Sequence, residues 1–279
     1  MNYFNNLLQK ENKILIFGKN GQLGKTFSSF LGNHKKTLQL SSKEVNFLEP
    51  YHIPKIIKEF KPNIIINTSA YTNVEKAEEN EEEAFLINSE AVKVIAESAK
   101  INNSIFIHYS TDYIFDGKIT DKYTIKDHPN PLNIYGKSKL KGEQYIRNID
   151  CNFIIFRISW LISEHGINFL KKIINKINDG KNFFVINDQV GFYLSGTAFT
   201  GIDADIASLS NERTHIPENL ENLYTKACFV SSSISGTCRS KFFKADISSN
   251  LTLTARSPSF PTVTCKPCMS NVDIFSFNI

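Results

Sequence analysis

The sequence predicts an α/β protein with a doubly wound, Rossmann-type parallel sheet and a smaller C-terminal substrate lobe. Three observations support this prediction. Short apolar segments alternate with helical segments over roughly the first two thirds of the chain. A glycine-rich turn follows the first apolar segment, and the segment 63–70 is apolar without the alternating polar residues of a half-exposed strand. Strands separated by helices imply right-handed crossovers between parallel strands, which are buried on both faces.

The expected strands are short and mostly apolar. The first ends at a glycine, and the third, which reads NIIINTSA, is apolar on both faces as in a buried parallel sheet. In chain order the expected strands are 13–18, 37–40, 63–70, 104–111, 152–159 and 182–187.

The expected helices lie between these strands. The segment 53–60 has helical spacing, and Pro54 suits a first helical turn. The acid-rich part of 75–100 is better explained as a solvated helix face than as a metal site. The expected helices are 21–31, 53–60, 75–100 and 131–148.

Composition changes after about residue 190, where Ser and Thr become frequent and the periodic patterns weaken. The run 231–240 looks like a loop, and 251–264 is compatible with strand or coil. The expected parts are an N-terminal extension (1–12), a dinucleotide-binding domain (13–190), whose residues near 160–180 contribute to the substrate pocket, and a smaller substrate lobe (191–279).

The overall composition excludes several classes of protein. Among 279 residues the net charge is +4, and no basic stripe suggests nucleic-acid binding. The first residues do not form a signal peptide, and no apolar run has the length of a membrane span. The five cysteines are odd in number, which predicts a reducing cytoplasm. They are Cys151, Cys228, Cys238, Cys265 and Cys268.

The first turn carries the pattern G-x-x-G-x-x-G, with Gly18, Gly21 and Gly24. Glycines at this point let backbone N–H groups approach a pyrophosphate, and the N-terminus of the next helix favours negative charge. A glycine triplet alone is also compatible with a flexible turn. Its place between the first strand and a helix favours a dinucleotide site.

The end of the second expected strand bears on the choice of cofactor. An acid there would accept a hydrogen bond from the ribose 2′-hydroxyl of NADH, but the first acid is Glu44. Ser41, Ser42 and Lys43 would tolerate a 2′-phosphate, so NADPH is the expected cofactor, with NADH as an alternative. A merely solvated turn is the competing interpretation of these residues.

A candidate catalytic set combines Tyr135, Lys139 and Thr111. Tyr135 and Lys139 form Y-x-x-x-K, and residues four apart share one face of a helix. A nearby ammonium would lower the tyrosine pKa from about 10 and so favour acid–base chemistry. The pair alone occurs by chance on surface helices. Thr111, at the carboxyl end of the fourth expected strand, makes the set specific.

These motifs resemble the extended short-chain dehydrogenases/reductases, and among them the dTDP-4-dehydrorhamnose reductase family. The matching blocks run through most of the chain, and the first three are the most specific. The blocks are ILIFGKNGQLG (14–24), NTSAYTNVEKAEENEEEAFLINSEAV (67–92), HYSTDYIFDG (108–117), YGKSKLKGE (135–143), FRISWL (156–161), GINFL (166–170), NDQVG (187–191) and the tail SFPTVTCKPCMSNVD (259–273).

The resemblance implies a role for each matching residue. Thr111, Tyr135 and Lys139 would be catalytic, and Thr111, Asp112, Tyr113 and Trp160 would contact the substrate. Asn88 would lie in the helix behind the cofactor site. The implied cofactor-binding residues are Gly18, Asn20, Gly21, Gln22, Leu23, Gly24, Ser41, Ala70, Tyr71, Tyr135 and Lys139.

The implied reaction is the NAD(P)H-dependent reduction of the C4 ketone of dTDP-4-dehydro-L-rhamnose to dTDP-L-rhamnose, a step of polysaccharide biosynthesis. Related nucleotide-sugar dehydratases carry Glu after Thr-Asp, whereas Tyr113 stands here, which argues against dehydration. The expected partner is a nucleotide-sugar, without nucleic acid, membrane or metal, and a homodimer is compatible with the resemblance.

Two departures keep other functions open. The family has a Pro-Thr step soon after the glycine of NDQVG, where this chain reads Phe-Tyr-Leu-Ser (192–195), and the chain ends soon after Asp273. The alternatives are a non-catalytic NADP-binding regulatory subunit on the same fold, or a reductase of another nucleotide-sugar. Cys265 and Cys268 are interpreted as reduced thiols, and His108 as a core residue.

Overall fold

The computed structural model describes residues 11–32, 34–119 and 123–179, and the strand segments 184–185, 193–195, 243–244 and 275–278. The chain divides into two compact units. The first holds the residues up to Gly166 with the strands at 193–195 and 275–278, and the second holds the helix α8 (Phe169–Asn178) and the strands at 184–185 and 243–244. The predicted domain limits at 12 and 190 stay a prediction.

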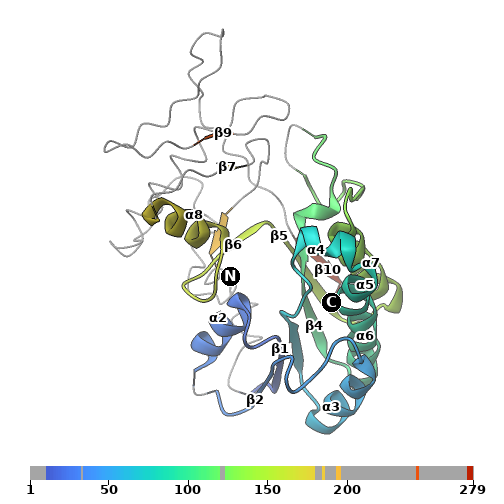
Figure 1. The fold of residues 1–279 in the computed structure, drawn as a ribbon. Helices are drawn as coiled ribbons and strands as arrows, with labels where there is room; N and C mark the ends of the chain where they lie inside the picture. The colour runs from blue at the N-terminus through green and yellow to red at the C-terminus, as the bar shows by residue number, and fades with distance from the viewer. Residues whose placement is uncertain are drawn as a thin grey trace. The chain divides into compact units, whose positions relative to one another are not determined.

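The first unit is built on one sheet whose strands have the order β2-β1-β3-β4-β5-β10 (Figure 1). The first five strands are parallel, which confirms the predicted fold class. The sixth runs antiparallel along the edge of β5 and was not predicted. The strands are β1 (Ile14–Phe17), β2 (Thr37–Leu40), β3 (Ile64–Asn67), β4 (Ile105–Thr111), β5 (Phe153–Ile158) and β10 (Phe275–Asn278).

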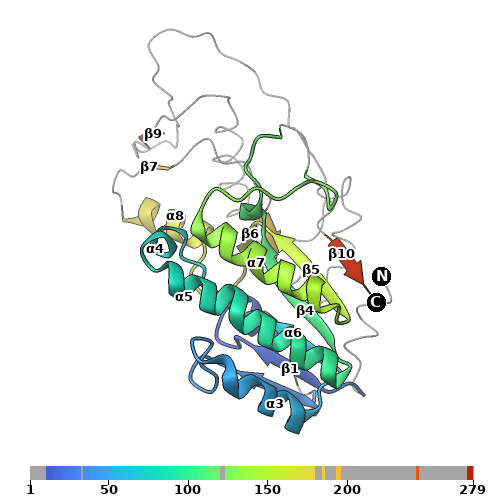
Figure 2. The ribbon, with the colours of Figure 1, turned by 90° about the vertical axis from the view of Figure 1, so that its right-hand side faces the viewer.

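Helices cover both faces of this sheet, as the apolar strands require. On one face α2 (Gln22–Leu31) packs against a core that includes Ile14, Ile16 and Phe27. On the other face, α3 (Ile53–Phe60), α6 (Ala91–Asn102) and α7 (Ile134–Ile149) pack against a core that includes Leu15 and Phe17 (Figure 2). Alternate residues of β1 therefore face opposite helical layers.

The long helical region predicted at 75–100 is helical, but it is divided into shorter elements. It consists of α4 (Val74–Glu79), α5 (Glu81–Phe85), a π-helical turn (Leu86–Glu90) and α6. The backbone of Asn80, with φ −123° and ψ 54°, interrupts the helix between α4 and α5. The acidic side chains of α4 and α5 are mostly exposed, as a solvated face predicts.

The predicted sixth strand, 182–187, does not join the parallel sheet. Its described part, β7 (Phe184–Val185), pairs antiparallel with β9 (Phe243–Lys244). In the first unit, β6 (Trp160–Ile162) pairs in parallel with β8 (Tyr193–Ser195), which lies within the Phe-Tyr-Leu-Ser departure. The segments 231–240 and 251–264, Cys265 and Cys268 lie outside the described residues.

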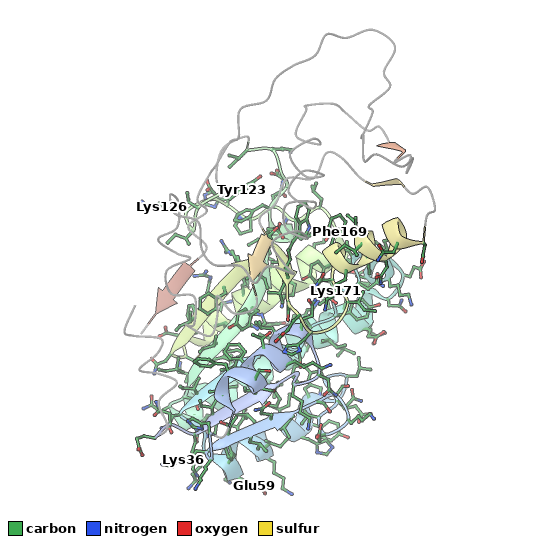
Figure 3. The ribbon with its side chains drawn as sticks, turned by 90° about the vertical axis from the view of Figure 1, so that its left-hand side faces the viewer. Lys36, Glu59, Tyr123, Lys126, Phe169 and Lys171 are labelled. Carbon is green, nitrogen blue, oxygen red and sulfur yellow. The ribbon has the colours of Figure 1, made fainter. Side chains whose placement is uncertain are left out.

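The strand order places the expected site. It reverses at β1, which pairs with β2 on one side and β3 on the other, and ligands bind at the carboxyl ends of strands beside such a reversal. In Figure 3, Tyr123 and Lys126 mark this end of the first unit, and Lys36 and Glu59 mark the opposite end. Short 3₁₀ turns at Pro50–His52 and Asp112–Ile114 complete the described elements. No helix in the described part is long and apolar enough to cross a membrane.

Candidate active site

The glycine-rich turn is shaped by close backbone packing at the carboxyl end of β1. Gly18 has φ 91°, and a Cβ there would lie 2.7 Å from Thr68 Oγ1 on the loop after β3. A Cβ on Gly24 would lie 2.1 Å from the Gly18 carbonyl oxygen. Only glycine fits both positions, so the turn stays tight against the sheet.

The N-terminus of α2 is suited to an anionic group. Gly21 begins this ten-residue helix without a side-chain cap, and the first turn carries no acidic residue. The backbone amides at the N-terminus of α2 and the positive end of the helix dipole therefore face this turn, and no carboxylate in the first turn of the helix occupies or neutralises them. Together with the tight glycine packing, this arrangement fits the pyrophosphate of a dinucleotide.

The side chain of Glu44 lies at the end of β2, although Glu44 comes four residues after this strand in the sequence. The Glu44 carboxylate accepts hydrogen bonds from the Ser41 backbone N–H at 2.8 Å, from Ser41 Oγ and from Lys19 Nζ. These contacts, the Lys19 bond first, lower the pKa of Glu44 to about 2. The turn 41–44 folds the acid back onto the strand end, beside the glycine loop that carries Lys19.

Thr111 and Tyr135 meet at the carboxyl end of β4. The Thr111 side chain lies close enough to the Tyr135 hydroxyl to act on its pKa, and the Tyr113 ring lies edge-on to the Tyr135 ring at 5.7 Å. The side chain of Asn133 caps α7 by accepting from the Gly136 backbone N–H at 2.7 Å. A Cβ on Gly136 would lie 2.2 Å from the Tyr113 carbonyl oxygen, so α7 begins in direct contact with this turn.

The electrostatics of Tyr135 differ from the expectation. Burial raises the pKa of Tyr135 to about 12, the charges of Asp112 and Tyr113 add to the rise, and the nearby Thr111 side chain opposes it. Lys139, expected to lower the tyrosine pKa, is not among the groups that shift it. The hydroxyl therefore stays protonated near neutral pH and carries a proton that it could donate.

Asp112 is held beside this pair. Its carboxylate accepts from Ser159 Oγ at 2.7 Å and from Thr111 Oγ1 at 3.1 Å. Burial raises the pKa of Asp112, and these hydrogen bonds oppose the rise. Asp112 thus connects β4 to the residues that precede β6.

Lys139 points toward β4. Its side chain is 1% exposed, and Nζ donates to the Tyr109 carbonyl oxygen at 2.5 Å and lies 3.4 Å from His108 Nε2. Burial lowers the pKa of Lys139 to about 8, while the negative charge of Glu143 raises it. His108 is fully buried near the ring of Phe106, so the predicted core position is correct, but the contact with Lys139 was not expected.

With this geometry in place, comparison with known proteins identifies the family. The model of the family described as "RmlD substrate binding domain" matches residues 12–270. The chain belongs to this family. The match covers the glycine turn, β4, the start of α7 and the residues that follow.

Individual relatives of this RmlD-family chain agree. It is 37% identical over 199 residues to a dTDP-4-dehydrorhamnose reductase of Aggregatibacter actinomycetemcomitans, covering 71% of the chain and 65% of that relative. Solved structures of dTDP-4-dehydrorhamnose reductases are similar as well. One from Clostridium acetobutylicum has a TM-score of 0.65 at 32% identity, covering 72% of each chain. One from Bacillus anthracis, in complex with NADP, has 0.67 at 27%, covering 78% and 81%.

The π-helical turn of this family member carries Asn88, which the resemblance placed only in a helix behind the cofactor site. Asn88 Oδ1 accepts from the Tyr71 backbone N–H at 2.9 Å, and Asn88 Nδ2 donates to the Tyr71 carbonyl at 3.0 Å. The same nitrogen lies 3.0 Å from Ser138 Oγ on α7. Asn88 therefore joins the loop after β3 to α7, the helix that carries Tyr135 and Lys139. The cofactor contacts of Ala70 and Tyr71 stay predictions.

Two further features of the RmlD-family chain lie near α7. Arg157 on β5 binds the buried Glu143 carboxylate through two nitrogens, with Nε to Oε1 at 3.0 Å and Nη2 to Oε2 at 2.7 Å. Glu143 lies four residues after Lys139 on α7, and this spacing could have indicated in the sequence that the two side chains share one helix face. Trp160 lies in β6, half-buried, and its substrate contact stays a prediction. Within the described ranges, no group of three or more His, Cys, Asp or Glu side chains could hold a metal ion.

Proposed function

We propose that this protein catalyses the NADPH-dependent reduction of the C4 ketone of dTDP-4-dehydro-L-rhamnose to dTDP-L-rhamnose. The observation that carries the proposal is that Thr111 and Tyr135 lie together at the carboxyl end of β4, with Lys139 buried one turn along α7 and bound to the Tyr109 carbonyl of the same strand. The names of the relatives support the substrate, because several are dTDP-4-dehydrorhamnose reductases.

The glycine turn and the N-terminus of α2 would hold the pyrophosphate of the cofactor, as the close packing of Gly18 and Gly24 suggests. The bound cofactor supplies a hydride. NADP in the Bacillus anthracis structure supports NADPH as the preferred cofactor. The Glu44 carboxylate at the end of β2 supports NADH as the alternative, because an acid there accepts from a ribose 2′-hydroxyl.

Side chains of the protein would supply the proton that the ketone oxygen receives. Reduction of a ketone adds a hydride to carbon and a proton to oxygen. Tyr135 donates the proton, since its raised pKa keeps the hydroxyl protonated until an alkoxide develops nearby. Thr111 Oγ1, which lies near that hydroxyl, would anchor the carbonyl oxygen. Lys139, in the protonated form that a pKa of about 8 still allows near neutral pH, would balance the charge when Tyr135 becomes a phenolate.

The retained catalytic set favours an enzyme over a non-catalytic NADP-binding subunit. A binding subunit requires the glycine turn, but it does not require a buried lysine one turn after a tyrosine that lies near Thr111. The contacts of Asp112, Tyr113 and Trp160 with the sugar nucleotide are part of the proposal. A cytoplasmic location rests on the odd number of cysteines, and a homodimer rests on the family resemblance.

The test is NADPH oxidation at ~340 nm, the nicotinamide absorbance, with dTDP-4-dehydro-L-rhamnose as substrate, comparing the native chain with Tyr135→Phe. Loss of the general acid is expected to lower kcat by about 10²- to 10⁴-fold while NADPH binding persists. Tyr145→Phe is the matched control, because that hydroxyl binds Glu90 away from the site. Native protein that binds NADPH without turnover would overturn the proposal and favour the regulatory subunit or another nucleotide-sugar.

A further inference from the structure

A buried polar chain joins the end of β3 to the catalytic helix. It runs from Ser69 through Asn67 and His108 to Lys139, and the side chains of its last three members are at most 1% exposed. Because water is excluded here, each donor must face an acceptor. The protonation of the chain can therefore be worked out from its fixed end.

The fixed end is a backbone amide. The Ser69 N–H donates to Asn67 Oδ1 at 3.0 Å, and a backbone N–H can only donate. The oxygen of the Asn67 amide must therefore face Ser69. The other side-chain atom, Nδ2, lies 3.4 Å from His108 Nδ1 and can only donate.

This contact decides the tautomer of His108. Since Asn67 Nδ2 donates, His108 Nδ1 must accept and carries no proton, which excludes the imidazolium as well as the Nδ1–H tautomer. The single proton of the neutral ring then lies on Nε2, and this N–H points at Lys139 Nζ, 3.4 Å away.

An N–H that faces Lys139 favours the uncharged amine. A neutral amine accepts from His108 Nε2–H through its lone pair and still donates to the Tyr109 carbonyl oxygen. An ammonium has no lone pair, so it would meet the N–H with another N–H. We infer that His108, held as the Nε2–H tautomer by Asn67, is a positioning residue that occupies the Lys139 lone pair and disfavours its protonation.

The inference rests on the role proposed for Lys139 and adds what controls it. The other ionisable groups around Lys139 are consistent with this account. Tyr109 on β4 and Tyr135 on α7 have raised pKa values and are uncharged near neutral pH. Glu143, one turn along α7, raises the pKa of Lys139, but its carboxylate is shared with Arg157 of β5. His108 opposes Glu143, in the same direction as burial.

The test measures the tautomer directly, through the imidazole nitrogens of protein labelled with nitrogen-15 at histidine. The His108 signals are assigned by their loss in His108→Gln. In the native chain Nε2 is expected to be protonated and Nδ1 not, without conversion to imidazolium across neutral pH. Asn67→Asp turns the donor into an acceptor and is expected to move the proton to Nδ1. Asn67→Ala removes the donor without adding charge and frees the ring to exchange between tautomers.

A second readout follows Lys139 itself, through the pH dependence of its Cε chemical shift. Its midpoint is expected to rise by about one pH unit in Asn67→Ala, the effect of one hydrogen bond to a charged group, and further in Asn67→Asp. Asn102→Ala is the control, because it removes a half-buried amide that binds Pro62 and Ser104 away from the site.

The outcomes are distinguishable from those of the proposed function. A native His108 protonated on Nδ1, or an unchanged Lys139 midpoint in both Asn67 variants, would overturn the inference. The predicted tautomer and midpoint shifts in a protein without turnover would support the inference and contradict the proposed reaction. Since both readouts use cofactor-free protein, neither depends on catalysis.

Discussion

Two polar clusters lie at the carboxyl ends of the same sheet, and they differ in their access to water. In the exposed cluster (Lys19, Ser41 and Glu44), the side chains of the ion pair are 32% and 42% exposed. In the buried cluster (Asn67, His108, Lys139, Glu143 and Arg157), those of Lys139 and Glu143 are 1% exposed. Water screens the first cluster, so its contacts can be exchanged for contacts with a ligand. In the second, every proton and charge needs a partner.

The largest effect on stability is expected when one member of the buried ion pair between Glu143 and Arg157 is removed. Arg157→Met leaves the Glu143 carboxylate in the interior without its two-nitrogen partner, since Arg147 reaches it only at 3.9 Å. Removing one partner of a buried pair costs about 3–5 kcal/mol in the free energy of unfolding. Urea denaturation monitored by circular dichroism measures this loss.

The control removes both charges at once. Glu143→Leu combined with Arg157→Met removes both charges of the ion pair, and most of the lost stability is expected to return. On the exposed side, Lys19→Met breaks the pair with Glu44 and should change stability by less than about 1 kcal/mol. Equal losses for Arg157→Met and Lys19→Met would show that burial does not separate the two clusters.

A smaller effect is expected from the pH dependence of stability. Burial lowers the pKa of Lys139 to about 8, whereas the unfolded lysine keeps its ordinary value of 10.5. Between these values the unfolded state binds more protons, so stability rises with pH through this window. From pH about 7.5 to about 9.5, the native chain should gain about 1–2 kcal/mol relative to Lys139→Met.

The comparison with Lys139→Met removes the contributions of other groups. Burial raises the pKa of Cys151 and of Tyr135, and each lowers stability as the unfolded group loses its proton first. Both groups are present in the two proteins and cancel in the difference. If the free energies of unfolding of the native chain and of Lys139→Met changed equally with pH, the pKa of Lys139 would not be lowered by folding.

Local patterns predicted the parts of the fold that depend on local chemistry. The strand 37–40 and the helix 53–60 were predicted to the residue, because apolar periodicity and Pro54 fix them. Helix spacing and the ends of parallel strands correctly placed Thr111 at the end of β4 and Tyr135 and Lys139 on one helix, whereas their catalytic roles stay predictions. Glycines of the first turn were found because tight packing leaves no room for a Cβ.

What the sequence did not show depends on contacts between distant residues. The break at Asn80 and the π-helical turn lie within a continuous helical pattern, and Asn88 gains its partners only from Tyr71 and Ser138. His108 looked like a core residue because its partner Lys139 follows 31 positions later. The direction of the Tyr135 pKa was mispredicted, because Lys139 turns toward β4 and burial is then the largest cause.

The smallest expected effect concerns the exposed cluster and the choice of cofactor. Glu44→Gln removes the negative charge that Ser41 and Lys19 hold at the end of β2. A 2′-phosphate would then meet the same donors without a competing carboxylate, so the ratio of kcat/KM for NADPH to that for NADH should rise about threefold, the modest size typical of an exposed, screened charge. Glu59→Gln makes the same charge change at the opposite end of the first unit and should leave the ratio unchanged. A fall in the ratio would show that Glu44 arranges the donors for the phosphate instead of excluding it.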